Sequence, residues 1–196
     1  MLAFSARPRI WQNGRMTPHL VGTGVRKVTL LGNPVLRKVL RKLKPEEIRS
    51  EEIHRLISEM AVTMREYGGV GIAGNQVGEN LSVFVMGLPK GTKRHPEGIA
   101  LTVVFNPVLK FFEAEGFEND WEGCLSAPEL RGMVRRYKKL ELTGHGLDGK
   151  PSKKIYEGFP ARVVQHETDH LNGLVYLDRM DGLGTLSYMS EIGRGK

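Results

Sequence analysis

The stretch Q165-H-E-T-D-H-L-N-G173 carries two histidines four positions apart, with a glutamate directly after the first. It overlaps residues 159–171, whose apolar spacing predicts a helix. In a helix, His166 and His170 project from the same face one turn apart, the spacing that two imidazoles need to share one metal ion. Glu167 would lie next to that face, where it could take a proton from water without being a ligand. The alternative is a helix with two surface histidines and a solvated glutamate.

A catalytic metal site usually has a third protein ligand, and the sequence offers three candidates. One type of metalloprotease extends the pattern to H-E-x-x-H-x-x-G-x-x-H, but Tyr176 stands at the last histidine position here. A second type uses a glutamate about twenty residues downstream. Glu191 lies 21 positions beyond His170, but its glycine-rich surroundings, residues 182–195, make a poor rigid platform. Both candidates are therefore disfavoured.

The third candidate is Cys124, in E122-G-C-L-S126. A lone cysteine is most often a small buried residue. A metal ion, however, deprotonates a thiol, and the resulting thiolate is a strong ligand at neutral pH. Two imidazoles and one thiolate would leave one tetrahedral position open for water. The preceding Gly123 permits an unusual backbone and Leu125 could offer its N–H beside the metal, so this context favours Cys124.

The remaining hydrophobic pattern indicates an α+β fold. Apolar residues at helical spacing predict a helix over residues 46–66, which the pair Gly68-Gly69 ends. The turn L147-D-G-K150 is of the hairpin type. Two helices among several short strands favour mostly antiparallel sheets around a central metal-binding helix. The predicted strands are residues 81–86, 101–105 and 137–143.

Length and composition fit one globular domain. The chain has 196 residues, of which 40% are hydrophobic, enough to bury a sizeable core. It contains no apolar run that could span a bilayer, so no membrane partner is expected. Its single cysteine cannot form an internal disulfide, which favours a cytoplasmic location. The sequence predicts no oligomeric state.

The net charge of +7 is concentrated near the N-terminus. Residues 1–45 contain ten Lys or Arg and no Asp or Glu. Residues 1–26 form a basic extension, for which there are three hypotheses. It could be a transit peptide for the mitochondrion or plastid, it could make transient contact with the RNA-rich ribosome, or it could be a solvated basic terminus. The domain prediction is completed by a catalytic domain over 27–180 and a short C-terminal tail over 181–196.

Three motifs resemble those of the peptide deformylases, in that family's order. They are G69-V-G-I-A-G-N-Q-V-G78, E122-G-C-L-S126 and Q165-H-E-T-D-H170. The resemblance covers residues 28–180, and three spaced motifs are more specific than one. The first motif usually reads G-x-G-x-A-A-x-Q, and Gly74 replaces its second alanine, a change expected to loosen the turn.

This resemblance implies a peptide-deformylase-like α+β fold and removal of the formyl group from N-formylmethionyl peptides. It also implies one divalent metal ion, usually iron(II), although such ligands would accept zinc(II) as well. Glu167 would accept a proton from water and pass it to the departing amine. The Gln76 amide and the Leu125 N–H would donate to the oxyanion of the tetrahedral intermediate.

The glycine-rich stretch G68-G-V-G71 lacks the spacing of a phosphate-binding loop. Because Gly71 has no side chain, a peptide substrate could approach the backbone and pair with it as an added strand. Val70 would contribute polar groups to that pairing. Val163 and Ile72 are the expected walls of an apolar pocket for the methionine side chain.

Other charged and histidine residues complete the candidate site. Glu122 and Arg131 are expected to form supporting charge contacts near the cysteine, although they could equally be solvated. Asp169 could accept the second N–H of a metal-bound imidazole. Histidines without ligand spacing are expected at the surface or in packing, namely His19, His54, His95 and His145.

Three other functions would explain parts of this pattern. A structural metal site in a binding module would have no open coordination position and no role for Glu167. A basic RNA-binding protein would show salt-dependent RNA affinity that survives metal removal. A metallopeptidase would share the metal chemistry but cleave internal peptide bonds, which a deformylase leaves intact.

Overall fold

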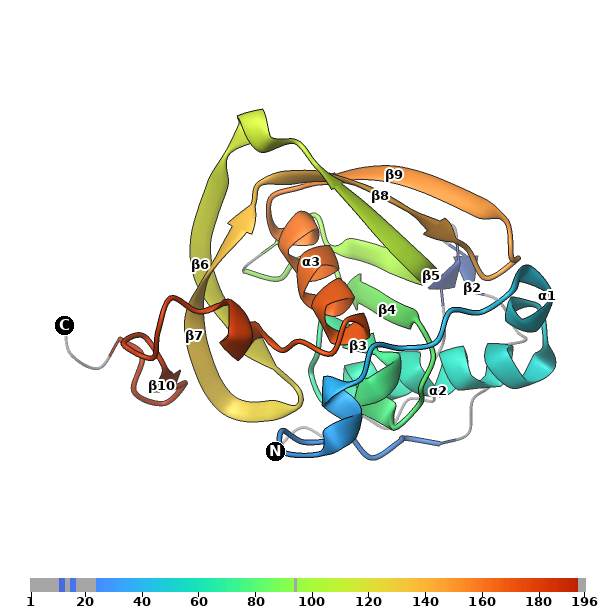
Figure 1. Ribbon diagram of the computed structural model, residues 1–196, viewed down its shortest axis with the longest axis horizontal. Coiled ribbons are helices and arrows are strands. Elements are labelled where there is room, and N and C mark those ends of the chain that lie inside the picture. The colour runs from blue at the N-terminus through green and yellow to red at the C-terminus, as the bar shows by residue number, and fades with distance from the viewer. Residues whose placement is uncertain (1–10, 13–14, 17–23, 94, 194–196) are drawn as a thin grey trace.

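The computed structural model describes residues 11–12, 15–16, 24–93 and 95–193 (Figure 1). Most of the basic extension lies outside these residues, as does His19, so the three readings of the extension remain predictions. Within it, two short strands pair in antiparallel fashion, β1 (Trp11–Gln12) and β2 (Arg15–Met16). No helix in the described part of the chain is long and apolar enough to cross a membrane.

The larger of the two main sheets has five antiparallel strands in the order β3-β4-β5-β8-β9. The predicted strands 81–86, 101–105 and 137–143 overlap β4, β5 and β8, and the predicted turn at 147–150 joins β8 to β9. The outer strand β9 was not predicted, because nearly all of its side chains are exposed and no apolar face marks it. The bounds are β3 (Gly71–Ala73), β4 (Val83–Leu88), β5 (Ile99–Phe111), β8 (Lys139–His145) and β9 (Pro151–Glu157).

Two helices, α2 (Glu51–Glu66) and α3 (Phe159–Leu171), pack on opposite faces of this sheet. Val85 of β4 packs with the α2 side of the core, and its neighbour Phe84 packs with the α3 side. Successive side chains of a strand point to opposite faces, so the continuous apolar run of β4 fits a strand covered on both sides. The predicted helix 159–171 agrees with α3 at both ends.

The predicted helix 46–66 is instead two helices, α1 (Pro45–Ile48) and α2. Ser50 separates them, with an extended backbone and a side-chain oxygen that accepts a hydrogen bond from the Ile53 N–H at 3.3 Å. Serine at this position satisfies one of the free N–H groups of a helix start. The helical period of the apolar residues was predicted correctly, and only the start of the long helix was wrong.

A second, smaller sheet has the order β10-β7-β6, and its strands are antiparallel. They are β6 (Phe117–Cys124), β7 (Ala127–Tyr137) and β10 (Ser187–Tyr188), none of which was predicted. Cys124 pairs with Ala127, so the cysteine ends β6 at a tight turn. Residues 181–196, predicted as a tail, contribute β10, in which Tyr188 pairs with Leu130. Figure 1 shows α3 between the β6–β7 hairpin and the five-stranded sheet.

Residues 28–31 (V-T-L-L) belong to neither sheet. Thr29 donates its N–H to the Gln76 carbonyl at 2.8 Å, and Leu31 donates to the Ser126 carbonyl at 2.7 Å. This segment therefore bonds to the first motif at Gln76 and to the second motif at Ser126. The short 3-10 helices are η1 (Pro34–Arg37), η2 (Gly74–Val77), η3 (Glu113–Glu115) and η4 (Tyr176–Arg179).

Candidate active site

The cysteine of β6 and the two histidines of α3 converge. The ligand atoms of Cys124, His166 and His170 all lie within 4.8 Å of one another. The thiol Sγ is 3.2 Å from Nε2 of His170, and the two imidazole centroids are 5.1 Å apart at 70°. The helical spacing thus presents both rings to the end of a strand some forty residues earlier in the chain.

Hydrogen-bond donors surround the Cys124 sulfur. The Gln76 side-chain amide donates to Sγ at 3.3 Å, and the Ser126 backbone N–H donates to it at 3.4 Å. Burial alone would raise the pKa of the thiol, but His170 and His166 outweigh it and hold the pKa of Cys124 well below its usual value. This shift favours the thiolate, the form that binds metals.

Glu122 orients His166. Nδ1 of His166 donates to Oε2 of Glu122 at 2.9 Å, which leaves Nε2 of the ring as the nitrogen available to a metal. Burial opposes ionisation of Glu122, yet His166 and Arg136 hold the pKa of its carboxyl far below the usual range. The Glu122 carboxylate therefore accepts the second N–H of an imidazole, the role that was expected of Asp169.

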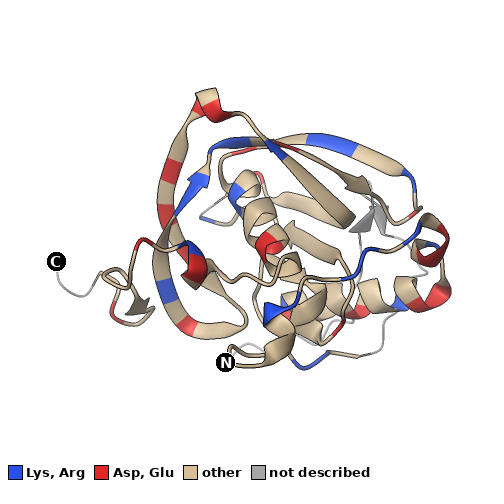
Figure 2. Ribbon diagram, in the orientation of Figure 1, with Lys and Arg blue, Asp and Glu red and all other residues tan. Residues whose placement is uncertain are grey.

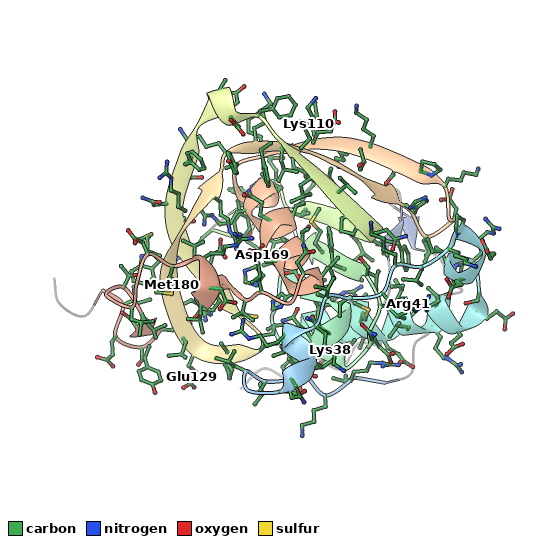
Figure 3. The ribbon with its side chains drawn as sticks, viewed as in Figure 1. Lys38, Arg41, Lys110, Glu129, Asp169 and Met180 are labelled. Carbon is green, nitrogen blue, oxygen red and sulfur yellow. The ribbon has the colours of Figure 1, made fainter. Side chains whose placement is uncertain are left out.

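Asp169 is buried but bonds to arginines. Its carboxylate accepts hydrogen bonds from Arg136 at 2.6 Å and from Arg179 at 2.7 Å. Figure 3 shows Asp169 on α3, on the side of the helix that faces the β6–β7 hairpin. The expectation that Asp169 supports a metal-bound imidazole is thus corrected, since Glu122 takes that place.

Arg131 also differs from expectation, because it makes no described contact with Glu122. Its guanidinium donates to the Leu130 carbonyl at 2.8 Å and lies against Gly123, where any side chain would collide with it. Glu122 is instead supported by Arg136, through two hydrogen bonds of 2.9 and 3.0 Å, and by Arg162, through one of 2.8 Å. Alternation along β7 explains the difference, since Arg136 is a buried position of the strand whereas Arg131 is half-buried.

Glu167 lies against the backbone of Gly71. A side chain at Gly71 would place its Cβ 2.5 Å from Cδ and 2.8 Å from Cγ of Glu167, so only glycine leaves room for the carboxylate. Burial raises the pKa of Glu167 to about 7, although His166 and His170 oppose the rise. A carboxyl with this pKa can both accept and return a proton near neutral pH.

A cavity of about 340 Å³ opens beside these groups. Among the predicted site residues, all but Ile72 and His170 line it. Ile72 is fully buried in the core cluster that faces α2. The prediction that it forms a wall of the pocket is therefore wrong. Val163, the other expected wall, does line the cavity.

Gly74 also corrects an expectation. It was expected to loosen the turn, but a Cβ at this position would collide with the carbonyl oxygen of Leu81. Glycine here allows a close approach of two backbone segments. The following Gln76 is held firmly, because its Oε1 accepts from the Ala73 N–H at 2.9 Å and its Nε2 donates to Ser126 Oγ at 3.1 Å.

The donor set fits a single divalent cation. A thiolate and two imidazoles supply three ligands of the kind that zinc and iron accept, with a water-accessible cavity beside them. Nδ1 of His170 and Oε2 of Glu167 are buried without a hydrogen-bond partner among the described residues. A purely structural metal site would leave both the cavity and the buried carboxyl of Glu167 without a role.

Sites of this kind belong to the class of hydrolases that use one metal ion to attack an amide. Comparison with known proteins identifies the family within this class of hydrolases. The family model described as "Polypeptide deformylase" matches residues 25–185, so this chain belongs to the peptide deformylase family. It is a hydrolase that removes the N-formyl group from nascent peptides, and the metallopeptidase alternative is not favoured.

Individual relatives agree with the family match. The chain is 38% identical over 167 residues to "Peptide deformylase 2" of Pseudomonas syringae, covering 84% of this chain and 92% of the relative. It is 37% identical over 174 residues to "Peptide deformylase 1" of Nitrosomonas europaea, covering 88% and 97%. A solved Acinetobacter baumannii class I type b peptide deformylase, bound to Met-Ala-Ser, is 32% identical with a TM-score of 0.74, over 80% of this chain and 99% of that chain.

Two buried arginines of the site, Arg136 and Arg162, were not predicted from the sequence. Arg136 occupies an inward position of a strand, and such positions are predicted from sequence only when they hold hydrophobic residues. Arg162 could have been found, because it precedes His166 by four residues and so shares its helix face. Two of the histidines without ligand spacing make packing contacts: His54 is bonded to the Leu147 carbonyl at 3.2 Å, and the His95 ring lies 6.1 Å from that of Phe159.

Proposed function

We propose that this chain hydrolyses the formamide of N-formylmethionyl peptides with one divalent metal ion held by Cys124, His166 and His170. The observation that carries the proposal is the convergence of the Cys124 sulfur and both imidazoles within 4.8 Å, beside a cavity that Cys124 and His166 line. Such an ion lowers the pKa of water and polarises the formyl carbonyl. Iron(II) is expected, as is usual for the family, with zinc(II) as the alternative that elemental analysis after anaerobic purification would distinguish.

Glu167 is the proposed proton carrier. It is buried at the cavity, and its pKa of about 7 lets it accept the proton of the attacking water and return it to the departing amine. Gly71 leaves the space that this carboxylate occupies.

Gln76 and Leu125 are the proposed oxyanion donors. Both line the cavity beside Cys124, and the Gln76 amide is oriented by its bond from the Ala73 N–H. Donors held beside the reacting carbon favour the oxyanion, and Gln76 Nε2 would exchange one of its bonds to Cys124 Sγ or Ser126 Oγ for it. The backbone N–H of Leu125 lies next in the chain to the cysteine, at the turn that ends β6.

The open edge of strand β3 is the proposed binding site for the peptide. In the described sheet β3 pairs only with β4, and the Val70 carbonyl already accepts from the Gly87 N–H at 2.9 Å. Alternate residues of a strand direct their polar groups to opposite edges, so Gly71 faces the open edge and Val70 does not. An extended peptide would pair with Gly71, and its methionine side chain would lie near Val163.

Formate release from a formyl-Met peptide tests the function directly. We expect stoichiometric formate, an intact peptide product and no cleavage of the same peptide without the formyl group. Cleavage of internal bonds in the unformylated peptide would instead identify a peptidase.

The site residues are tested by two substitutions. Glu167→Gln should keep the metal and lower kcat by about 10²–10⁴-fold, because shape is retained but proton transfer is lost. Cys124→Ala should lose metal affinity as measured by elemental analysis after dialysis. Wild-type turnover in the first variant, or wild-type metal content in the second, would remove that residue from the proposed mechanism.

The basic residues 1–26 are proposed to make a transient contact with the ribosome, where nascent formylated chains emerge in the cytoplasm or an organelle. Their composition, rich in Arg and free of acids, supports this. Co-sedimentation with ribosomes that is abolished by salt and by deletion of residues 1–23 is the expected result. Equal sedimentation of the deleted protein would contradict it.

A further inference from the structure

Arg162 joins α3 to both strands of the β6–β7 hairpin. It is 3% exposed, one helical turn before His166. Its Nη1 donates to the Val134 carbonyl of β7 at 2.9 Å, and its Nη2 donates to the Glu118 carbonyl of β6 at 2.8 Å. The same Nη1 donates to Oε1 of Glu122 at 2.8 Å. One buried guanidinium therefore connects the helix of the histidines with the strand of the cysteine.

The Glu122 carboxylate receives two donors on each oxygen. Oε1 accepts from Nε of Arg136 at 2.9 Å and from Arg162 at 2.8 Å. Oε2 accepts from Nη2 of Arg136 at 3.0 Å and from Nδ1 of His166 at 2.9 Å. A carboxylate offers about four acceptor positions, so this one is saturated. Any rotation of the group would break several charge-assisted hydrogen bonds at once.

We infer that Arg162 is a positioning residue for the metal centre. It fixes Oε1 of Glu122, and this keeps Oε2 directed at Nδ1 of His166 and Nε2 of that ring directed at the metal. Arg136 also holds this carboxylate, but it does so from β7, whereas Arg162 holds it from the helix that carries His166. The inference rests on the proposed metal site and adds a residue that neither the motifs nor the ligand spacing identifies.

Removal of this guanidinium should therefore loosen the imidazole. In Arg162→Met, Oε1 of Glu122 loses one donor and the carboxylate gains freedom to rotate, while a side chain of similar length fills the space. Partners of metal-bound imidazoles typically change metal affinity by about 10–100-fold. We expect zinc to leave this variant roughly tenfold faster than the wild type, at the low end of that range because Arg136 remains.

The experiment uses the full-length protein loaded with one equivalent of zinc(II), and measures the rate of zinc transfer to a chromogenic chelator. Arg162→Lys should give an intermediate rate, since an ammonium can reach Glu122 but cannot also bond two carbonyls. Arg179→Met is the matched control, because Arg179 belongs to the same charge cluster but bonds to Asp169. Its zinc should leave at the wild-type rate.

Faster zinc loss in the Arg162 variants than in Arg179→Met supports the inference. Equal rates overturn it, even where Arg162→Met has a lower Tm, because that would make the residue a hairpin anchor only. If Arg162→Met does not fold, the comparison of Arg162→Lys with Arg179→Met decides in the same way. Wild-type protein that holds no zinc, or Cys124→Ala that holds it as tightly, overturns the metal site itself and is distinguishable from either result.

Discussion

At the scale of single residues, the site depends on glycines, whose lack of a side chain leaves room for neighbouring groups. Gly71 provides the space for the Glu167 carboxylate, and Gly123 provides the space for the Arg131 guanidinium. The motif glycines could be recognised in the sequence, but the partner of each could not. Those partners lie 96 and 8 positions away along the chain, and nothing local marks them.

Gly71→Ala tests the first of these contacts. The added methyl group would overlap Glu167, so the carboxylate must move while the metal ligands stay in place. We expect kcat to fall by about 10²-fold, the typical effect of a catalytic group displaced by about an ångström, with unchanged metal content. Gly24→Ala is the control, because nothing lies within 4 Å of its Cβ. Equal activity of the two variants would show that Glu167 tolerates the displacement.

At the scale of elements, α3 was predictable and the β6–β7 hairpin was not. The helix shows its apolar period and its histidine spacing together, so pattern and chemistry agree. In the hairpin, inward positions are taken by Glu122 and Arg136, both 5% exposed. Binary hydrophobic patterns treat such residues as solvated, although mutual ion pairs compensate for their burial. The convergence of Cys124, His166 and His170 could thus be predicted from sequence, whereas the charged network around them could not.

Ser50→Ala tests the element boundary that periodicity missed. Loss of the side-chain acceptor for the Ile53 N–H should lower the free energy of unfolding by about 1 kcal/mol, measured by denaturant titration. Ser50→Asp should restore it, since a carboxylate also caps a helix and favours its positive end. Because α2 packs on the sheet face away from α3, kcat should not change in either variant.

At the scale of the whole molecule, the three proposed metal ligands come from two separate layers. Cys124 ends a strand of the smaller sheet, while His166 and His170 belong to the helix that packs on the larger one. A bound ion would therefore connect both layers as well as supply reactivity. A ligand that binds only the folded state stabilises it by an amount set by its concentration and affinity.

Metal removal should accordingly lower the Tm. An ion present at about 100 times its Kd contributes roughly 3 kcal/mol, which corresponds to a Tm difference on the order of 5–10 °C for a chain of this size. Differential scanning with and without chelator measures it. Cys124→Ala should melt at one temperature under both conditions, and a chelator effect of wild-type size in that variant would place the ion elsewhere.

The outer strand β9 has a consequence for the molecule in a crowded solution. Its far edge is unpaired in the described sheet, and its exposed side chains include Lys153 and Lys154. Figure 2 shows the blue of Lys and Arg on this strand. A free strand edge is a template on which another chain can add and begin an aggregate. Two copies aligned along this edge would bring their lysines together, and like-charge repulsion would oppose the fibre-like growth that Ile155, 52% exposed, would otherwise favour.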